Sequence, residues 1–400
     1  MTVATQYAED TEPFRLSQLI YDKRYRSITL QIITIFLFML AVGWLINNVI
    51  ENFRDLGKEF SFGFLFDAAS YDINQRLIEY DSSSPHWKAA LVGILNTLLV
   101  AFLGCIAATI LGVAIGVLRL SKNWLVSRLM TIYIEAFRNV PVLLWILLAS
   151  TAFSALLPAP RQAPVMMGGG FVPTNRGFYF PSLIWEQGSG VLVGVLIASI
   201  IGVIAFGRWA TVRQAATGEI LPTFWIKLGI LILPFLIFFF LLGRPIGLSL
   251  PELKGFNFQG GLFVRNSFMA LWIALSLYTA AFIAESVRAG IQAISKGQSE
   301  AAFSLGLPPN RTMNLVILPQ ALRIIIPPLI SQYLNLTKNS SLAIAVGYMD
   351  ATGTLGGITL NQTGKEMECI LLLMMFYLII SLLISAVMNV YNSTVALKER

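Results

Sequence analysis

Residues 300–319 read Glu-Ala-Ala-Phe-Ser-Leu-Gly-Leu-Pro-Pro-Asn-Arg-Thr-Met-Asn-Leu-Val-Ile-Leu-Pro, a largely polar hairpin inside a chain that is otherwise mostly apolar. The Glu-Ala-Ala triplet opens a short helical run, Gly306 breaks that run, and Pro308-Pro309 prevents its simple continuation. A second run then leads to Leu318-Pro319. We therefore predict two short helices at an angle, which form a compact knob able to sit in a groove of another protein. The alternative is an ordinary amphipathic re-entrant hairpin.

The composition places the rest of the chain in a membrane. Of its 400 residues, 56% are hydrophobic and 12% are charged, and the mean hydropathy is +0.72. These values exclude an ordinary soluble domain. A membrane-spanning helix needs roughly 20 mainly apolar residues. The stretches that qualify are 29–50, 89–118, 129–157, 189–207, 225–243, 266–288, 325–348 and 369–391. The first begins too late and runs too long for a secretory signal, so we expect it to remain as an anchor.

The distribution of Lys and Arg between the loops predicts the orientation. If the N-terminus is cytoplasmic, the inside loops carry more basic residues than the outside loops, which are longer. An even number of spans then places both termini and residues 294–318 on the cytoplasmic side. The net charge of +7 does not indicate nucleic-acid binding, because the basic residues lie mostly at helix ends, where they meet anionic headgroups.

The sequence predicts neither a disulfide nor a metal site. Cys105 and Cys369 lie in or against apolar segments and are expected to be packed thiols. His86 is the single histidine, which argues against a Cys/His metal site. No cofactor is expected.

The chain divides into an accessory front part and a transmembrane core. Residues 1–28 are predicted to be a cytoplasmic tail, and 29–88 an accessory first helix followed by an aromatic external segment that is ordered against the membrane surface. Residues 89–395 form the transmembrane domain. Within it, 158–263 is an inserted external loop with two extra helices. The Pro and Gly content of 158–188 indicates loop structure, with a short interfacial helix near 178–180 as an option.

The spacing within the hairpin resembles the EAA loop of ABC-importer permeases. That loop reads Glu-Ala-Ala, three residues, Gly, nine residues, then aliphatic-x-Leu-Pro, and here Val316 stands at the aliphatic position. Three further blocks resemble the polar-amino-acid permease domain, the histidine/glutamate/glutamine class of these importers. They are Glu135–Pro141, Tyr278–Ile291 and Lys338–Leu342, and the resemblance covers roughly residues 85–395.

The layout is longer than the five spans usual in that class, and it is similar to the general L-amino-acid permease subgroup. This subgroup includes bacterial glutamate/glutamine/aspartate/asparagine transporters. The front-end block Tyr21–Ser27 and the stretch Leu91–Thr97 fit it, and its Q-type subunit is the most similar.

The resemblance implies an all-α integral membrane protein with the type I ABC-importer permease fold and about eight transmembrane helices, located in the bacterial inner membrane. It implies an M-type permease as second subunit, two ATPase subunits, a periplasmic amino-acid-binding protein and an L-amino acid substrate. The residues expected to couple to the ATPase are Glu300, Ala301, Ala302, Gly306, Leu307 and Arg311.

Charged residues within the predicted spans are the candidates for the substrate path. A charge at mid-bilayer costs about 2.5–3.5 kcal/mol on insertion scales. Glu135 and Arg138 can pair on one helix face, and so can Glu285 and Arg288. Lys338 has no acidic residue within four positions, so it needs another helix, a helix C-terminus or water.

These groups have a structural interpretation and a functional one. As internal ion pairs they would stabilise their own helices. A cavity for an amino acid needs both signs of charge, or amide and hydroxyl dipoles, to replace water. The candidate path residues are Asn96, Thr97, Glu135, Arg138, Glu285 and Lys338. The pair Gly112 and Gly116 permits close helix packing, either static or moving during transport.

The chain is not expected to hydrolyse ATP. Gly57-Lys58 and Gly364-Lys365 are each followed by Glu and lack the first glycine of a phosphate-binding loop. Energy would therefore enter from a separate ATPase through the hairpin. The alternative function is a secondary transporter or channel that acts alone, but such proteins commonly have two symmetry-related halves, whereas the sequence shows one Glu-Ala-Ala hairpin. A permease for another solute, such as phosphonate or methionine, would keep the hairpin but not the blocks Glu135–Pro141 and Glu285–Gly290.

Overall fold

The computed structural model describes residues 23–219 and 221–395. Most of the predicted cytoplasmic tail, and the end of the chain beyond 395, therefore lie outside the described residues. The chain divides by its contacts into two units, Met1–Gly63 and Phe64–Arg400, and each is described by itself.

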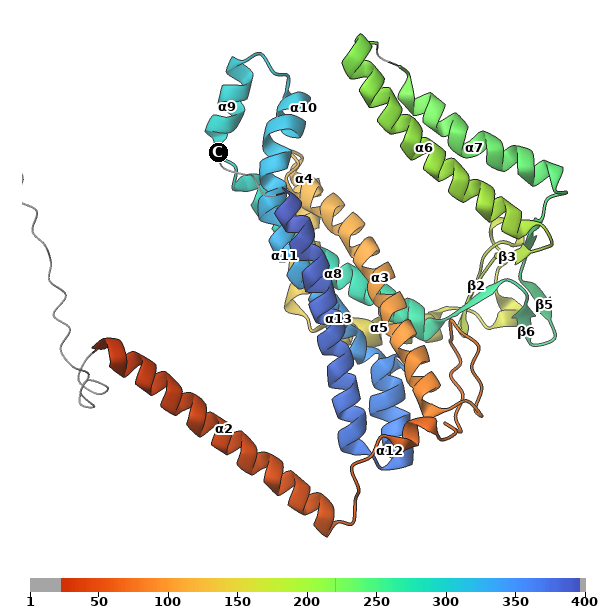
Figure 1. The fold of residues 1–400 in the computed structure, drawn as a ribbon. Coiled ribbons are helices and arrows are strands. Elements are labelled where there is room, and N and C mark those ends of the chain that lie inside the picture. The colour runs from red at the N-terminus through yellow and green to blue at the C-terminus, as the bar shows by residue number, and fades with distance from the viewer. Residues whose placement is uncertain (1–22, 220, 396–400) are drawn as a thin grey trace, which may run out of the picture. The chain divides into compact units, whose positions relative to one another are not determined.

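The first unit contains one long helix, α2, Lys23–Asp55 (Figure 1). With 33 residues and a rise of 1.5 Å each, it is about 50 Å long, more than the roughly 30 Å of a hydrocarbon layer. Its apolar side chains are exposed, for example Phe36, Leu40 and Trp44. A helix that is apolar on all sides suits a lipid environment, and α2 contains the predicted span 29–50.

The long helices of the second unit form a bundle in which α8 packs against α3 and α11, and α13 packs against α11 (Figure 1). Their bounds are α3 His86–Arg119, α8 Asn266–Gln292, α11 Leu318–Asn339 and α13 Glu366–Val395. Glycines let α3 approach α8 closely. A Cβ added to Gly112 would lie 2.6 Å from Ile283 Cβ, and one added to Gly116 would lie 2.7 Å from the Ala284 carbonyl oxygen. This glycine pair therefore packs against α8.

The predicted span 129–157 is not one straight helix. It is split into α4, Trp124–Asn139, and α5, Val142–Leu156, which are bent by 105°. Pro141 causes the break, because a proline disfavours helical geometry in the residue before it, and Val140 is extended. The described residues contain seven helices long and apolar enough to cross a membrane, or up to eight if the bent pair is one span.

The insertion carries short strands as well as the two extra helices. The helices are α6, Ser189–Thr217, and α7, Thr223–Leu241, which pack against each other. The short helical turns are η2 Pro160–Gln162 and η3 Met167–Gly169; the strands are β1 Val172–Thr174, β2 Gly177–Phe180, β3 Ser182–Trp185, β4 Ile246–Ser249, β5 Glu252–Lys254, β6 Asn257–Gln259 and β7 Leu262–Arg265. All pairs are antiparallel, in the orders β1-β2-β7, β3-β4 and β5-β6.

The optional interfacial helix near 178–180 is wrong, because Phe178–Phe180 belong to β2. Aromatic residues favour a pleated, half-buried surface, and here they pair with β7. That partner lies far along the chain, beyond α6 and α7, so local sequence could not reveal it.

The segment before α3 belongs to the core rather than to the first helix. It contains the turn η1, Gly63–Phe66, and the boundary between units follows Gly63, not residue 88. Tyr71, Ile73 and Tyr80 pack against Ala89 and Val92 of α3. The order of this aromatic segment therefore comes from packing on α3.

The hairpin has the two predicted helical runs, but the second is not a separate short helix. Its first helix is α9, Lys296–Ser304. The second run, α10 Pro309–Thr312, passes through a π-turn, η4 Met313–Ile317, directly into α11. The prolyl nitrogen of Pro319 cannot donate a hydrogen bond, and the wider π-turn lets the helix continue past it.

Between α11 and α13 the chain makes a compact crossing against α3. It consists of η5 Ser340–Val346, the π-helical η6 Thr352–Thr359, and α12 Leu360–Thr363. Residues 347–351 join η5 to η6 and contact α3 through hydrogen bonds described below.

Candidate functional site

Helix α9 ends in a defined glycine cap. The Leu307 N–H donates to the Ala302 carbonyl at 3.1 Å, and the Gly306 N–H donates to the Phe303 carbonyl at 2.9 Å. This is the Schellman arrangement, which needs a left-handed residue at its turn. Gly306 has φ +76. Open space surrounds it, since a Cβ there would meet no atom within 4 Å. The glycine is therefore required by backbone conformation alone.

The cap presents apolar side chains to the surroundings. Leu305 is 81% exposed and Phe303 is 50% exposed, and Leu315 after the turn is also exposed. Exposed apolar side chains gathered at one place mark a surface for another protein or for the membrane. The hairpin thus exposes apolar side chains beside its turn, and docking on a partner stays a prediction.

The predicted coupling residues do not all lie on that surface. Glu300, Ala301, Gly306 and Arg311 are exposed, and Leu307 is half-buried. Ala302, with 4% exposure, is interior. It holds α9 against the following segment rather than offering a contact to a partner.

Glu285 joins three helices at the end of the bundle nearest α9. Its carboxylate accepts from Arg288 Nη2 at 2.5 Å and from Arg119 Nη1 of α3, and Arg138 Nη1 of α4 lies 3.9 Å away. Glu285, Arg119 and Arg288 are half-buried, whereas Arg138 is exposed. Three guanidinium groups therefore surround one carboxylate. Charge-assisted bonds of this kind are stronger than neutral ones.

The predicted pair Glu135–Arg138 does not form. Arg138 lies over the Phe282 ring of α8, 5.4 Å from its centroid, and is directed toward Glu285. Glu135 instead accepts from Asn139 Nδ2 at 3.1 Å. Spacing along one helix could not indicate that α8 offers Arg138 another carboxylate.

Asn96 and Thr97 attach the crossing to α3. Asn96 Nδ2 donates to the carbonyls of Gln75 and Met349, both at 2.8 Å. Thr97 Oγ1 accepts from the Ala351 N–H at 3.0 Å. Both side chains are fully buried, and Asn96 Oδ1 has no hydrogen-bond partner within the described part of the chain. Their first role is therefore to hold residues 347–351 in place.

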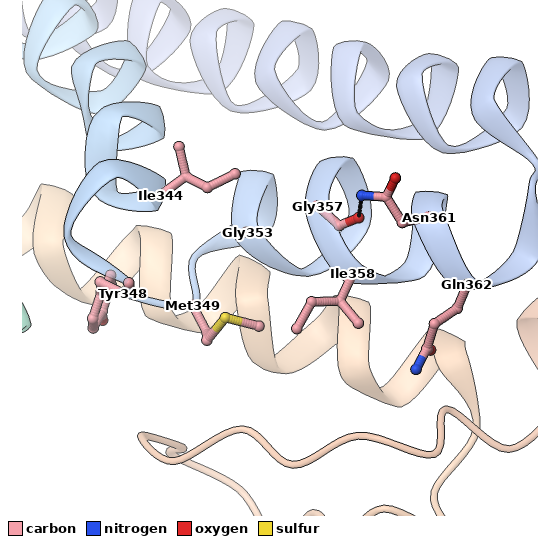
Figure 2. Close-up of a pocket in the computed structure, with 9 residues that line it drawn as sticks. Ile344, Tyr348, Met349, Gly353, Gly357, Ile358, Asn361 and Gln362 are labelled. Atoms are coloured by element: carbon pink, nitrogen blue, oxygen red, sulfur yellow. Dashed lines mark hydrogen bonds between the residues drawn. The ribbon is translucent and has the colours of Figure 1, made fainter.

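A pocket of about 460 Å³ opens beside these residues (Figure 2). Its lining comes from the crossing and α12: Ile344, Gly347, Tyr348, Met349, Gly353, Gly357, Ile358, Asn361 and Gln362. The Asn361 amide donates to the Gly357 carbonyl at 2.8 Å. Gly347 is exposed, whereas Gly353 is buried and the Gly357 carbonyl is used by Asn361, so the polar side chains of the lining are chiefly the amides of Asn361 and Gln362.

Asp350 lies directly behind this pocket and was missed by the sequence reasoning. Its Oδ1 accepts from the N–H of the pocket residue Gly353 at 2.8 Å, and Oδ2 accepts from Tyr377 of α13 at 3.4 Å. The side chain is fully buried. A signal existed, because Asp350 is the single acidic residue between 340 and 365.

The predicted path residues therefore fall in separate places. Asn96 and Thr97 are near the pocket, whereas Arg138 and Glu285 are at the α9 end of the bundle. Lys338 is exposed in the last turn of α11. Of the partners suggested for it, which were another helix, a helix C-terminus or water, the structure therefore favours the C-terminus of a helix. Since Gly290 packs on Ile325, Lys338 and Glu285 are separated along the bundle by about two helical turns.

Comparison with known proteins of similar sequence identifies the family of this chain. The family described as "Binding-protein-dependent transport system inner membrane component" matches residues 190–396, just over half of the chain. The glutamate/glutamine/aspartate/asparagine transport system permease protein BztB of Rhodobacter capsulatus is 52% identical, over 97% of each chain. The general L-amino acid transport system permease protein AapQ of Rhizobium johnstonii is 45% identical, over 99% of this chain and 100% of that one.

A third relative agrees with these two. The putative amino-acid ABC transporter permease protein YhdX of Escherichia coli is 44% identical over 94% of this chain and 95% of its own. The resemblance stated from the motifs is thereby confirmed, and so is the helical membrane fold with seven to eight candidate spans. The chain belongs to the family of inner membrane components, or permeases, of binding-protein-dependent ABC transport systems.

Proposed function

We propose that this chain is the membrane-spanning permease subunit of an ATP-driven, binding-protein-dependent importer of L-amino acids in a bacterial inner membrane. The observation that carries the proposal is the α9 knob, with its glycine cap and exposed Phe303 and Leu305, on a bundle related over its whole length to such permeases. A transporter or channel acting alone would have no use for this surface.

The substrate class follows from the relatives and from the pocket. The printed names of the relatives specify glutamate, glutamine, aspartate, asparagine or general L-amino acids. The pocket offers the amides of Asn361 and Gln362 and the backbone of the exposed Gly347. Such dipoles can replace the water around an ammonium and a carboxylate. We therefore infer that polar or acidic L-amino acids pass this pocket.

The chain itself performs no catalysis in this proposal. Two separate ATPase subunits hydrolyse ATP, and each coupling knob docks on one of them. Glu300 would meet a cation of the ATPase, and the apolar side chains beside Gly306 would fill its groove. A binding protein delivers substrate at the outer face, and an M-type permease completes the path.

Closure of the ATPases would then shift the bundle between inward-open and outward-open states. A ligand or partner shifts such an equilibrium only as far as its contacts differ between the two states. The knob is suited to this role because α10, η4 and α11 form one continuous helical run from its turn into the bundle. Movement of the knob would be transmitted directly to α11.

The change Gly306→Val tests the coupling. A β-branched residue in the left-handed region costs about 1–2 kcal/mol, and this corresponds to roughly a five- to thirtyfold loss of the correct hairpin population. We expect uptake to fall by that order while the ATPase either leaves the membrane or hydrolyses ATP without transport. Uptake is measured in proteoliposomes together with ATP hydrolysis.

Gly218→Val is the matched control. Gly218 caps α6 with φ +73, and it too has open space around it. The backbone strain is therefore equal, but the position is away from the knob. We expect near-normal coupling in this control. Normal uptake in Gly306→Val would contradict the proposed role of the hairpin.

A further inference from the structure

A cavity of about 410 Å³ lies between the β1–β2–β7 sheet and the β5–β6 hairpin. Its lining residues are Arg176, Tyr179, Asn257, Phe263 and Arg265. The register pairs Tyr179 with Phe263 and Gly177 with Arg265, so these side chains project from one face of the β2–β7 ladder. Phe258 of β6 packs on Tyr179 with ring centroids 5.4 Å apart and covers that face.

The groups that line the cavity are closely packed. A Cβ on Gly177 would lie 2.4 Å from Phe263 Cε2, so only glycine lets this ring lie over the ladder. Arg176 Nη1 donates to Asn257 Oδ1 at 2.5 Å and thereby joins the sheet to the hairpin. The walls therefore come from both elements, and two guanidinium groups share the space between them.

The two guanidinium groups of this cavity, of the exposed Arg176 and the half-buried Arg265, have no counter-ion among the described residues. Arg265 Nε is buried without a hydrogen-bond partner, and within residues 23–219 and 221–395 no carboxylate lies at ion-pair distance from Arg176 or Arg265. Burial raises the pKa of Tyr179, although Arg176 acts in the opposite direction. The phenol thus stays neutral near pH 7 and cannot neutralise the arginines. A buried donor left unpaired is costly, which favours a ligand that accepts.

We propose that this cavity is a binding site for a carboxylate group. Planar guanidinium groups match carboxylate geometry with paired hydrogen bonds, and the Asn257 amide and the aromatic walls can accommodate the rest of a small acidic group. The carboxylate comes either from an acidic side chain of a docked protein or from a free small acid. The first source rests on the proposed function, which brings a binding protein to the outer face; the second does not.

Residues beside the cavity connect a ligand bound there to the helix bundle. Arg265 directly precedes α8, whose Asn266 donates to the Asn175 carbonyl at 2.6 Å. The Asn175 N–H in turn donates to the carbonyl of Pro158, just beyond α5, at 2.9 Å. The cavity thus lies where α5 and α8 meet the sheet. Helix α8, with 27 residues, extends about 40 Å from there toward the Glu285 cluster.

The test measures binding to the full-length chain in lipid nanodiscs. Calorimetry with glutarate, a dicarboxylate without an ammonium group, detects a free small acid, and neutral glutaramide is its comparison ligand. A second arm measures binding of the amino-acid-binding protein at low and high salt. Neither arm requires transport, so a failed import assay leaves this test intact.

The variants are Arg176→Gln and, as the matched control, Lys254→Gln. Both remove one positive charge from the insertion, but Lys254 lies on the exposed side of the β5–β6 hairpin beside Glu252. We expect Arg176→Gln to weaken binding of glutarate, of the binding protein, or of both by about tenfold or more, and Lys254→Gln to change it little. Arg265→Lys keeps the charge and should weaken binding less than Arg176→Gln. The proposal is overturned if neither ligand binds, or if Arg176→Gln and Lys254→Gln have equal effects in both arms.

Discussion

Glu285 has contacts with other helices that its neighbours on α8 do not indicate. The sequence placed it three residues before Arg288, and that pair is present at 2.5 Å. The same carboxylate also accepts from Arg119, and Arg138 lies 3.9 Å away. Removing one charge therefore affects α3, α4 and α8 together, and it leaves three guanidinium groups, two of them half-buried, close to one another.

We expect Glu285→Gln to lower the amount of assembled permease. A broken buried pair costs about 3–5 kcal/mol and an exposed pair under about 1 kcal/mol, so this half-buried cluster should lose about 1–3 kcal/mol. Fluorescence-detected gel filtration and thermal denaturation measure the loss. Glu135→Gln is the matched control, because Glu135 is exposed and bonds only to Asn139 among the contacts described.

Glu285 and Lys338, which the sequence analysis assigned to the substrate path, can also be tested by transport. Lys338→Met should leave assembly intact, since Lys338 is exposed at a helix end. If Glu285→Gln instead assembles normally and changes uptake of acidic and neutral amino acids unequally, then Glu285 senses the substrate and the structural interpretation fails.

Among the helices and strands, the sequence predicted those features that depend on the length of apolar segments and on the spacing of glycines. The spans, the first helix of the hairpin and the close packing of α3 through Gly112 and Gly116 follow from such local patterns, but the identity of the packing partner, α8, does not. Pro141 indicated the break between α4 and α5, but the continuous apolar run of residues 129–157 favoured the prediction of one span. The strands were not predictable, because each has only three or four residues and β2 finds its partner β7 beyond two inserted helices.

The candidate site was predicted less completely for the same physical reason. Asn96 and Thr97 were found as polar groups in an apolar helix, but their partners at Met349 and Ala351 lie about 250 positions away. Contacts of this kind depend on packing between helices, and one sequence does not contain them. Asp350 was overlooked because it lies between spans rather than within one.

The α3–α8 contact gives an element-level prediction. Gly112→Val places atoms inside the volume of Ile283, and overpacking of this kind costs about 1–3 kcal/mol. We expect less folded protein and a lower thermal midpoint. Gly194→Val in α6 is the control, since a Cβ there meets nothing within 4 Å. Equal stability of the two variants would show that the helices can separate without cost, which would favour the moving-contact interpretation.

Two of the described helices present large apolar surfaces, each considered within its own unit. The apolar side chains of α2 are exposed, and those of α7 are exposed or half-buried although it packs against α6. Lipid can cover such surfaces, and so can a second permease. The pocket beside residues 344–362 is likewise open within the described part of the chain. A path that must be closed alternately on either side therefore requires a second wall.

The last prediction concerns that second wall. We predict that this wall is a different permease chain, of the M type, as the resemblance to the Q-type subunit implies, rather than a second copy of this one. A tagged form of this chain, purified from native membranes in mild detergent, should bring with it a distinct permease, an ATPase and no stoichiometric excess of itself, as measured by mass spectrometry of the intact complex. Uptake after reconstitution should need the distinct permease. If the chain purifies with an ATPase and its own copies alone, and this assembly still transports amino acids, then the pocket is closed by symmetry rather than by a partner, and the heteromeric arrangement is wrong.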